Sequence, residues 1–442
     1  MKKTILLSAI IVLGIHANAQ ESWTLRECID YATAHNVSIL QAEISVKESE
    51  VEANTAKWAR LPNLSASGSQ SFNWGRTQTA IKDEDTGDYT TKYVDASSRG
   101  TNMSLSTSVP VFTGFEIPSK YELSKLNLKA SMADLQKAKE DLAINIASAY
   151  LQALYNKEMH QVAVNQSAIS KEQCDRIEAL ERLGKASVAE VAEAKSRVAQ
   201  DELNVVQARN NYNLSILDLT QLIELETPEG FEIADPDQAF TINTLTPPDE
   251  IFATAMVNKP AIQAAQARLE GSKHSIKIAQ SALYPSVNLN GSLGTSYYST
   301  INRTFSQQLG DNYSKYIGVS LNIPIFNRFA TRNRVRTAKL QRDNYALQLE
   351  NTKKTLYKEI QQAWYNAVAA ESKYTTSEAA TEASQASFEL TSKKYENGTA
   401  TAVAYNEAKQ NLMKAQSEEL QAKYEYIFRT KILDFYKGIE IQ

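Results

Sequence analysis

The sequence contains little of what usually interrupts helices or cross-links chains. Its 442 residues include 15 glycines, 10 prolines and two cysteines. Cys28 and Cys174 are too few for a disulfide framework and lack the spacing of a metal site. They could pair in an oxidising compartment, but unpaired cysteines are usually buried, so we predict two buried thiols.

The sequence also lacks a recognisable catalytic pattern. The four histidines have no paired ligand spacing, and there is no phosphate-binding glycine loop, nucleophile elbow or zinc motif. We therefore expect a protein that is not an enzyme and that holds no cofactor and no metal. If the protein takes part in a process that consumes energy, partner proteins must supply that energy.

Long hydrophobic runs and a strong net charge are absent as well. Beyond the N-terminal region no stretch reaches eighteen apolar residues, so we expect no membrane-spanning helix in the mature chain. The balance of 47 Lys+Arg against 51 Asp+Glu gives a net charge of -4, which is no footprint for nucleic acid. A hydrophobic content of 43% and a charged content of 22% argue against global disorder.

The N-terminus has the features of an export signal. Lys2 and Lys3 are followed by an apolar stretch, residues 5–15, and by the small-residue cleavage pattern Ala-Asn-Ala at 17–19. The apolar stretch is too short to span a bilayer. Residues 1–19 are therefore predicted to be a signal peptide that is removed on export.

The mature chain is a tandem duplication. At an offset of 214 residues, 109–112 (VPVF) matches 323–326 (IPIF), and 193–195 (EAK) recurs at 407–409. Upstream, sequence identities favour an offset of 222. The predicted organisation is a first repeat at 20–222, a proline-rich connector at 223–250 and a second repeat at 251–442.

Each repeat contains a long segment without glycine or proline. The segments, about 119–183 and 331–397, predict helices about 100 Å long, each followed by a second helix at about 187–222 or 401–437. Two stripes of apolar and small residues along the first segment indicate a neighbouring helix on each side. A long antiparallel coiled-coil hairpin, as in an exported tether or adhesin, remains an alternative.

Before each long segment lies a predicted β-hairpin, at about 63–112 and 286–325. Its strands alternate apolar with small polar residues and have aromatic residues near their ends, as strands of a transmembrane β-barrel do. A half-buried strand in a soluble sheet is the alternative. Because four strands are too few to close a barrel, such a chain must oligomerise, as a dimer, trimer or tetramer. A barrel enzyme is disfavoured because no catalytic constellation accompanies the strands.

These features together resemble the TolC-like outer-membrane efflux proteins, the outer membrane factor family. The resemblance is carried by 23–32 (WTLRECIDYA), by Pro62 and Pro285 before the strands, and by the strand exits VPVF and IPIF. It implies a mixed, mainly α fold with a homotrimer in which twelve strands form one outer-membrane β-barrel. The long helices would continue it as a periplasmic α-barrel.

The resemblance also implies a function. Such proteins are exit ducts of tripartite efflux pumps or type I secretion systems, located in the outer membrane with a large periplasmic portion. The implied partners are further copies of the chain, outer-membrane lipid, a periplasmic adaptor protein and an inner-membrane transporter of the RND, ABC or MFS type.

The resemblance finally implies three sets of site residues. The candidates for the periplasmic entrance are Glu190, Glu193, Tyr395 and Glu407. The candidate adaptor-docking tips are Arg182, Leu183, Gly184, Lys185, Ala186, Ser187, Gly398, Thr399, Ala400 and Thr401. The candidate membrane-interface aromatics are Phe112, Phe115, Phe326 and Phe329.

The acidic candidates also carry a prediction of their own. Carboxylates repeated around a symmetry axis favour cations at a constriction. The alternative is that they are solvated acids near helix N-termini, where they suit the helix dipole. Ala400 and Ala404 stand where the family has charged residues, so the contacts that close the entrance are reduced in this chain.

Overall fold

The computed structural model describes residues 22–82, 87, 89–234 and 244–440. The predicted signal peptide at 1–19 lies outside these residues. The fold is mixed and mainly helical, which confirms the predicted class. Two compact units are present: a helical unit formed by the described residues up to Ser45 with Met132–Gln263 and Asn351–Gln442, and a strand unit formed by Val46–Ser131 and Ala264–Glu350. Each unit takes segments from both sequence repeats.

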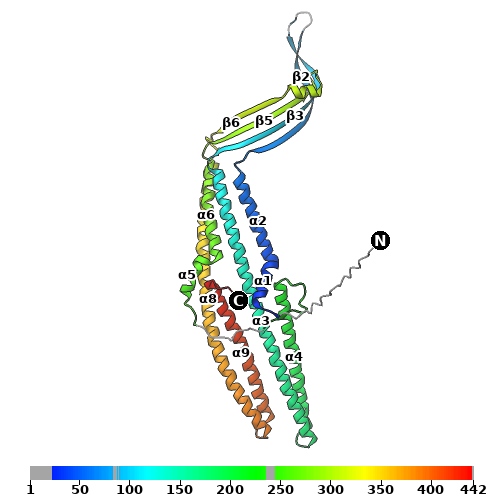
Figure 1. Ribbon diagram of the computed structural model, residues 1–442, viewed down its shortest axis with the longest axis vertical. Helices are drawn as coiled ribbons and strands as arrows, with labels where there is room; N and C mark the ends of the chain where they lie inside the picture. The colour runs from blue at the N-terminus through cyan, green and yellow to red at the C-terminus, as the bar shows by residue number, and fades with distance from the viewer. Residues whose placement is uncertain (1–21, 83–86, 88, 235–243, 441–442) are drawn as a thin grey trace, which may run out of the picture. The chain divides into compact units, whose positions relative to one another are not determined.

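The two halves of the chain have closely matching elements (Figure 1). The first half contains β1 (Ser22–Trp23), α1 (Leu25–His35), α2 (Val37–Trp58), β2 (Asn63–Lys82), β3 (Tyr89–Thr113), α3 (Glu116–Arg182) and α4 (Val188–Leu222). The second half contains β4 (Glu232–Ile233), α5 (Pro248–Asn258), α6 (Pro260–Ser281), β5 (Ser286–Tyr298), α7 (Phe305–Asp311), β6 (Ser314–Asn322), α8 (Ala330–Glu396) and α9 (Ala402–Lys437). Both α3 and α8 have 67 residues, and both α2 and α6 have 22.

Burial follows the same repeat. Ile146 in α3 and Ile360 in α8, which are 214 residues apart, are both fully buried. In the preceding helices the buried pairs are separated by 223 residues: Cys28 with Ile251, Ala32 with Ala255, and Ile39 with Ile262. The packed positions therefore favour an offset of 223 in these helices, one residue more than the 222 suggested by sequence identities.

The long helix α3 begins at Glu116, before Pro118, whereas the sequence predicted a start at 119. Proline is tolerated in the first turn because no intrahelical bond needs its missing N–H. Among the described residues, no helix combines the length and apolarity needed to cross a bilayer.

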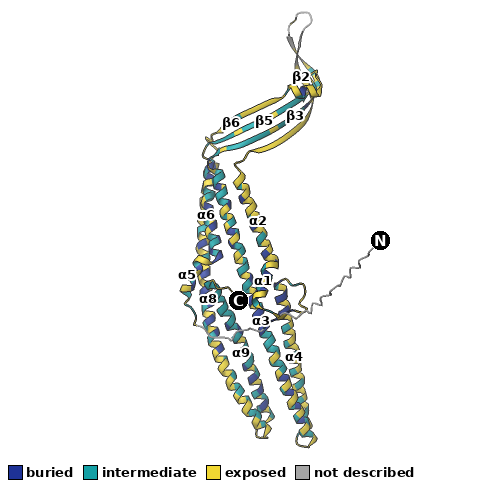
Figure 2. Cartoon of the chain, in the orientation of Figure 1, coloured by how far each residue is buried: buried dark blue, intermediate teal, exposed yellow. Residues whose placement is uncertain are grey.

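The core of the helical unit joins elements that are distant in sequence. Cys28 of α1, Ile146 of α3 and Leu219 of α4 are completely buried in one cluster. The Tyr150 hydroxyl lies 3.0 Å from the Trp23 carbonyl oxygen and 2.9 Å from that of Ala234. Figure 2 shows buried residues along the helices, interspersed with many exposed ones.

The strand unit contains one antiparallel sheet with the order β2-β3-β5-β6. Its register places serine and asparagine side chains on one face, where Ser65 and Ser106 lie 2.8 Å apart and Ser108 donates to Asn290 over 2.9 Å. The other face carries apolar side chains, and Ile317 and Val319 on β6 are 84% and 70% exposed. The alternation predicted from sequence is confirmed in both hairpins.

The connection between β5 and β6 contains α7, which the sequence did not predict. Gln308 on α7 is buried, and its side-chain amide donates to the carbonyl oxygens of Tyr298, Ile301 and Arg303. Its Oε1 atom accepts from the Tyr298 N–H over 3.0 Å. One glutamine thus replaces the backbone hydrogen bonds that an irregular loop lacks.

Each strand-to-helix turn uses two residues in the left-handed region. These are Gly114 and Phe115 before α3, and Arg328 and Phe329 before α8. Only Gly114 has no space for a side chain, because an added Cβ would lie 2.4 Å from the Ser281 carbonyl oxygen. The first repeat therefore requires glycine where the second carries arginine.

Replacing Gly114 by Ala should destabilise the strand unit by about 2 kcal/mol or more, because left-handed backbone alone costs about 1–2 kcal/mol for a residue with a Cβ. The clash with Ser281 adds to this cost. The measurement is the unfolding temperature of the purified protein, with Arg328→Gly, at the matching position of the second repeat, as the control that should not lower it. Equal unfolding temperatures for Gly114→Ala and wild type would contradict the steric argument.

Candidate functional site

The helices of the helical unit end in two matching turns. Gly184 after α3 and Gly398 after α8 both have left-handed backbones, with φ of 68° and 71°. In each turn the next residue donates back to the last helical turn: the Lys185 N–H to the Leu180 carbonyl and the Thr399 N–H to the Lys394 carbonyl, both over 2.8 Å. These hydrogen bonds satisfy a carbonyl group in the last turn of each helix, which ends at the glycine.

Three residues after each glycine, a hydroxyl caps the next helix. Ser187 caps α4 and Thr401 caps α9. The tips that carry these turns are largely exposed, and the Leu183 side chain is 70% exposed. The sequence assigned these residues to docking tips. A partner protein that covered this turn would remove the exposed apolar surface of Leu183 from water.

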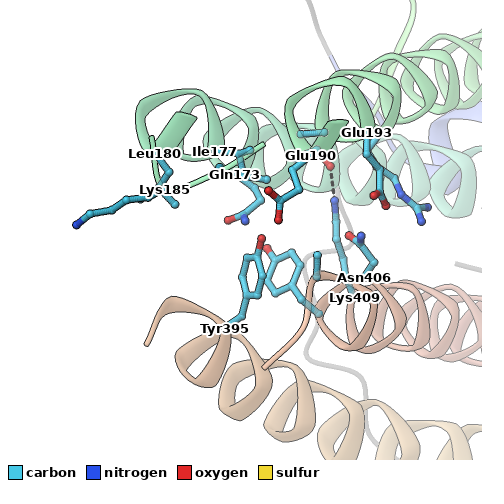
Figure 3. Close-up of a pocket in the computed structure, with 15 residues that line it drawn as sticks. Gln173, Ile177, Leu180, Lys185, Glu190, Glu193, Tyr395, Asn406 and Lys409 are labelled. Carbon is cyan, nitrogen blue, oxygen red and sulfur yellow. Dashed lines mark hydrogen bonds between the residues drawn. The ribbon is translucent and has the colours of Figure 1, made fainter. Parts of the chain in front are cut away.

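A cavity of about 110 Å³ lies between the two helical hairpins, close to the tips (Figure 3). Glu190 and Glu193 from α4 and Tyr395 from α8 line it, so three of the four predicted entrance residues come together. Glu407, the fourth, is exposed on α9 and is not among the lining residues. Glu190 and Tyr395 point into the cavity from opposite sides.

Glu190 has a local structural role as well. Its Oε2 atom accepts from the Ser187 N–H over 2.7 Å and from the Ser187 hydroxyl over 2.9 Å, which completes a capping box at the start of α4. These hydrogen bonds lower the pKa of Glu190, first through the backbone bond and then through the side-chain bond. The helix-terminus alternative considered from sequence thus describes part of what this carboxylate does.

An aromatic and cationic cluster joins α3 and α8 beside the cavity. Tyr395 stacks on Tyr405 with ring centroids 5.0 Å apart, and the Arg176 guanidinium lies 6.0 Å from the Tyr395 ring. Arg176 also donates from Nη2 to the Glu396 carbonyl oxygen over 3.0 Å. Burial raises the pKa of Tyr405. The sequence singled out Tyr395 but gave no signal for Arg176.

The most buried charge of the cavity is Lys409, which sequence reasoning missed as a site residue. Its Nζ lies 3.0 Å from Asp201 Oδ2, and both side chains are mostly buried. Burial lowers the pKa of Lys409, whereas Asp201 raises it through a hydrogen bond and its charge. The repeated EAK motif pointed to this lysine but could not show its burial.

The remaining candidates lie in the strand unit and among the cysteines. Phe112 and Phe115 meet edge-to-face with ring centroids 5.3 Å apart, and Phe326 and Phe329 repeat the arrangement at 5.6 Å. All four therefore flank the turns between strand and long helix. Cys28 and Cys174 are buried and unpaired. No group of metal-binding side chains occurs in the part of the chain that the structure describes.

The chain belongs to the outer membrane efflux protein family, whose model matches residues 28–223 and 252–432. It is therefore an outer-membrane exit duct of the class that serves efflux and secretion, with a large periplasmic portion. This confirms the resemblance drawn from the sequence and favours the channel over the coiled-coil tether. The family is one of passive channels rather than enzymes.

Individual relatives agree with this membership. The chain is 21% identical to the outer membrane efflux protein BepC of Brucella suis, covering 96% of this chain and 86% of that one. It is also 21% identical to the outer membrane protein TolC of Vibrio cholerae, with 97% and 93% covered.

Solved structures share the fold. The CmeC outer membrane channel of Campylobacter jejuni superposes with a TM-score of 0.76 at 22% identity, covering 95% of this chain and 86% of that one. The outer membrane protein VceC of Vibrio cholerae gives a TM-score of 0.75 at 17% identity, with 95% and 97% covered.

Proposed function

We propose that this chain forms a homotrimeric, non-enzymatic duct that receives cargo from a periplasmic adaptor and an inner-membrane transporter. The observation that carries oligomerisation is the open four-stranded sheet. Among the described residues, no strand pairs with the outer edge of β2 or of β6. Open edges are not tolerated in lipid, where every backbone hydrogen bond must be satisfied.

The direction of the strands supports closure by copies of the same chain. All neighbouring strands in the order β2-β3-β5-β6 are antiparallel, so β2 and β6 run in opposite directions. β6 of one copy can therefore pair antiparallel with β2 of the next, and the same contact repeated around an axis closes a ring. Three copies, the number that the family resemblance implies, give twelve strands, which is within the range of bacterial barrels.

The sidedness of the sheet supports the same arrangement. The exposed apolar face would contact lipid and the serine-rich face would line the water-filled interior. Phe112, Phe115, Phe326 and Phe329 would then lie at a membrane interface, where aromatic rings are favoured. The helical tips with Gly184 and Gly398 would face the periplasm.

The relatives include proteins named for secretion and proteins named for export, so both a secretion system and an efflux pump are supported. One relative from Pseudomonas aeruginosa is the alkaline protease secretion protein AprF, and another is the pyoverdine export outer membrane protein OpmQ. We propose for this chain what both systems have in common, an exit duct to which other proteins deliver the cargo. The two tips, residues 182–187 and 398–401, are the proposed contacts with the adaptor.

Leu183→Asp tests this proposal, because it places a charge at the most exposed apolar side chain of the first tip. Capture of the adaptor by the purified channel should fall about tenfold or more, because the contact would bury an unpaired carboxylate in place of an apolar side chain. The oligomer should stay intact because Leu183 is exposed. Ile301→Asp, in the β5–β6 loop of the strand unit, is the control. Unchanged capture by Leu183→Asp would remove this tip from the docking surface.

A further inference from the structure

The serine-rich face of the sheet contains a cavity of about 270 Å³. It lies across all four strands, with Ser65 on β2, Ser106 and Ser108 on β3, Asn290 on β5 and Tyr316 on β6. The registers of the strands place these side chains on one face. None of the described residues that line the cavity carries a charge.

The hydroxyl and amide groups of the cavity can both donate and accept hydrogen bonds. The Ser65 and Ser106 hydroxyl oxygens lie 2.8 Å apart. Ser108 donates to Asn290 Oδ1 over 2.9 Å, and Asn290 Nδ2 donates to the Ser320 hydroxyl oxygen over 3.1 Å. A hydroxyl oxygen has two lone pairs and an amide nitrogen has two hydrogens, so these contacts leave further hydrogen-bonding capacity. The polar surface is therefore ordered and still able to bind a neutral polar ligand.

One aromatic ring borders this polar surface. Tyr316 and Gly318 are two residues apart on β6 and therefore share a face. A Cβ added to Gly318 would lie 2.1 Å from the Tyr316 hydroxyl oxygen, so the phenol ring lies along the strand over the glycine. Because Tyr316 is 57% exposed, much of its ring surface stays accessible.

The duplication shows that this pair is specific to the second repeat. The residue 214 positions before Tyr316 is Asn102, and the residue 214 positions before Gly318 is Ser104. The first repeat thus has neither the ring nor the glycine that gives the ring its room. The alternating pattern of a barrel strand does not require either residue.

The composition of the cavity selects the class of ligand. An anion needs a cationic partner and a cation needs a carboxylate, and neither occurs among the described lining residues. A wholly apolar ligand would deprive the hydroxyl and amide groups of water without replacing its hydrogen bonds. A sugar ring fits, because it combines hydroxyl groups at its rim with a face of C–H groups that packs on an aromatic ring.

The size of the cavity agrees with this class. Its volume of about 270 Å³ is close to the lower end of the range for small-molecule sites, roughly 300–1,000 Å³. A mono- or disaccharide is therefore the favoured size of ligand.

We propose that this cavity binds neutral saccharide groups, with Tyr316 stacking on the sugar ring and Asn290 and the serines holding its hydroxyls. The site rests on the proposed function, in which this face lines the interior of the duct. Cargo that carries sugar groups would then contact the wall there. The binding must be weak, because a duct conducts only what it also releases.

Saturation-transfer NMR on the purified protein tests the site, with maltose, cellobiose and lactose as probes. The detergent is lauryldimethylamine oxide, because a detergent with a sugar head group would compete. Saturation of protein protons should reach the sugar ring protons, and the dissociation constant should rise about tenfold or more in Tyr316→Ala. Tyr316→Phe keeps the ring and should bind nearly as well as wild type. Tyr298→Ala removes another exposed tyrosine, on β5 and outside the cavity, and is the matched control that should bind as wild type does.

Gly318→Ala separates the position of the ring from its presence. The added methyl group should displace the ring from the strand and weaken binding several-fold, although the tyrosine remains. Absence of transfer to all three sugars in wild type, or equal dissociation constants for Tyr316→Ala and wild type, would overturn the proposal. A channel that conducts in lipid bilayers but binds no sugar refutes the site alone. A protein that binds sugar but forms no conducting oligomer refutes the duct instead.

Discussion

Ile146→Pro should abolish assembly of the protein. Ile146 lies in the middle of α3, is fully buried and packs in the core cluster with Leu219. Proline inside a helix costs about 3 kcal/mol or more, because it removes a hydrogen bond and clashes with the preceding turn. Loss of the buried side chain adds about 2–5 kcal/mol, as for other large core residues. In a symmetric oligomer the damage occurs in every copy.

The measurement for this variant is the amount of oligomer in isolated outer membranes, read on gels run without boiling. Ile146→Val is the matched control, with an expected cost of about 0.5–1.5 kcal/mol and normal assembly. Wild-type amounts of oligomer for Ile146→Pro would show that α3 is not needed as one continuous helix.

Glu190→Gln combined with Glu407→Gln should lower the cation preference of the reconstituted channel several-fold. If these carboxylates lie at the periplasmic entrance, as the family resemblance implies, a symmetry axis would repeat each of them as a ring of negative charge. Glutamine at 190 keeps the capping box with Ser187, since glutamine serves at that position as glutamate does. The variant therefore changes charge and leaves the start of α4 in place.

The hydrogen bonds between Glu190 and Ser187 also determine how the cation preference changes in acidic solution. Because Ser187 lowers the pKa of Glu190, this carboxylate stays charged at a pH where an ordinary glutamate is already protonated. Its contribution to the cap is present above the usual glutamate pKa and is lost as the pH falls through the lowered value. Cation preference should therefore persist into moderately acidic solution.

The reversal potential in a salt gradient measures this preference. Glu229→Gln, an exposed acid in the connector between the repeats, serves as the control and should leave it unchanged. Equal reversal potentials for wild type and the Glu190/Glu407 double variant would exclude both residues from the constriction.

Much of the fold could be predicted because local sequence patterns determine its helices and strands. The long helices follow from the absence of glycine and proline, and the sheet follows from alternation, which the registers of β3 and β5 confirm. The helix starts shifted by a few residues where Pro118 could be accommodated in a first turn. α7 escaped prediction because Gln308 holds it through bonds to backbone atoms, which no periodicity reveals.

The site could be predicted only in part. Glycine followed by a hydroxyl residue marks the tips, and the family pattern locates Glu190, Glu193 and Tyr395 close together. Lys409 on α9 contacts Asp201 on α4, although the two residues are 208 positions apart in the sequence. The patterns of apolar residues in these two helices are alike and do not reveal the contact. Because Lys195 and Lys409 occur in the same motif, only packing between the hairpins distinguishes the exposed lysine from the buried one.

Identical copies of the chain are proposed to close the open sheet into one channel. Native mass spectrometry of the protein extracted from outer membranes in mild detergent tests this closure. We predict three times the mass of the mature chain, with adaptor subunits bound in a fraction of the particles. A monomer found only in the soluble periplasmic fraction would show that the chain does not close into a membrane channel.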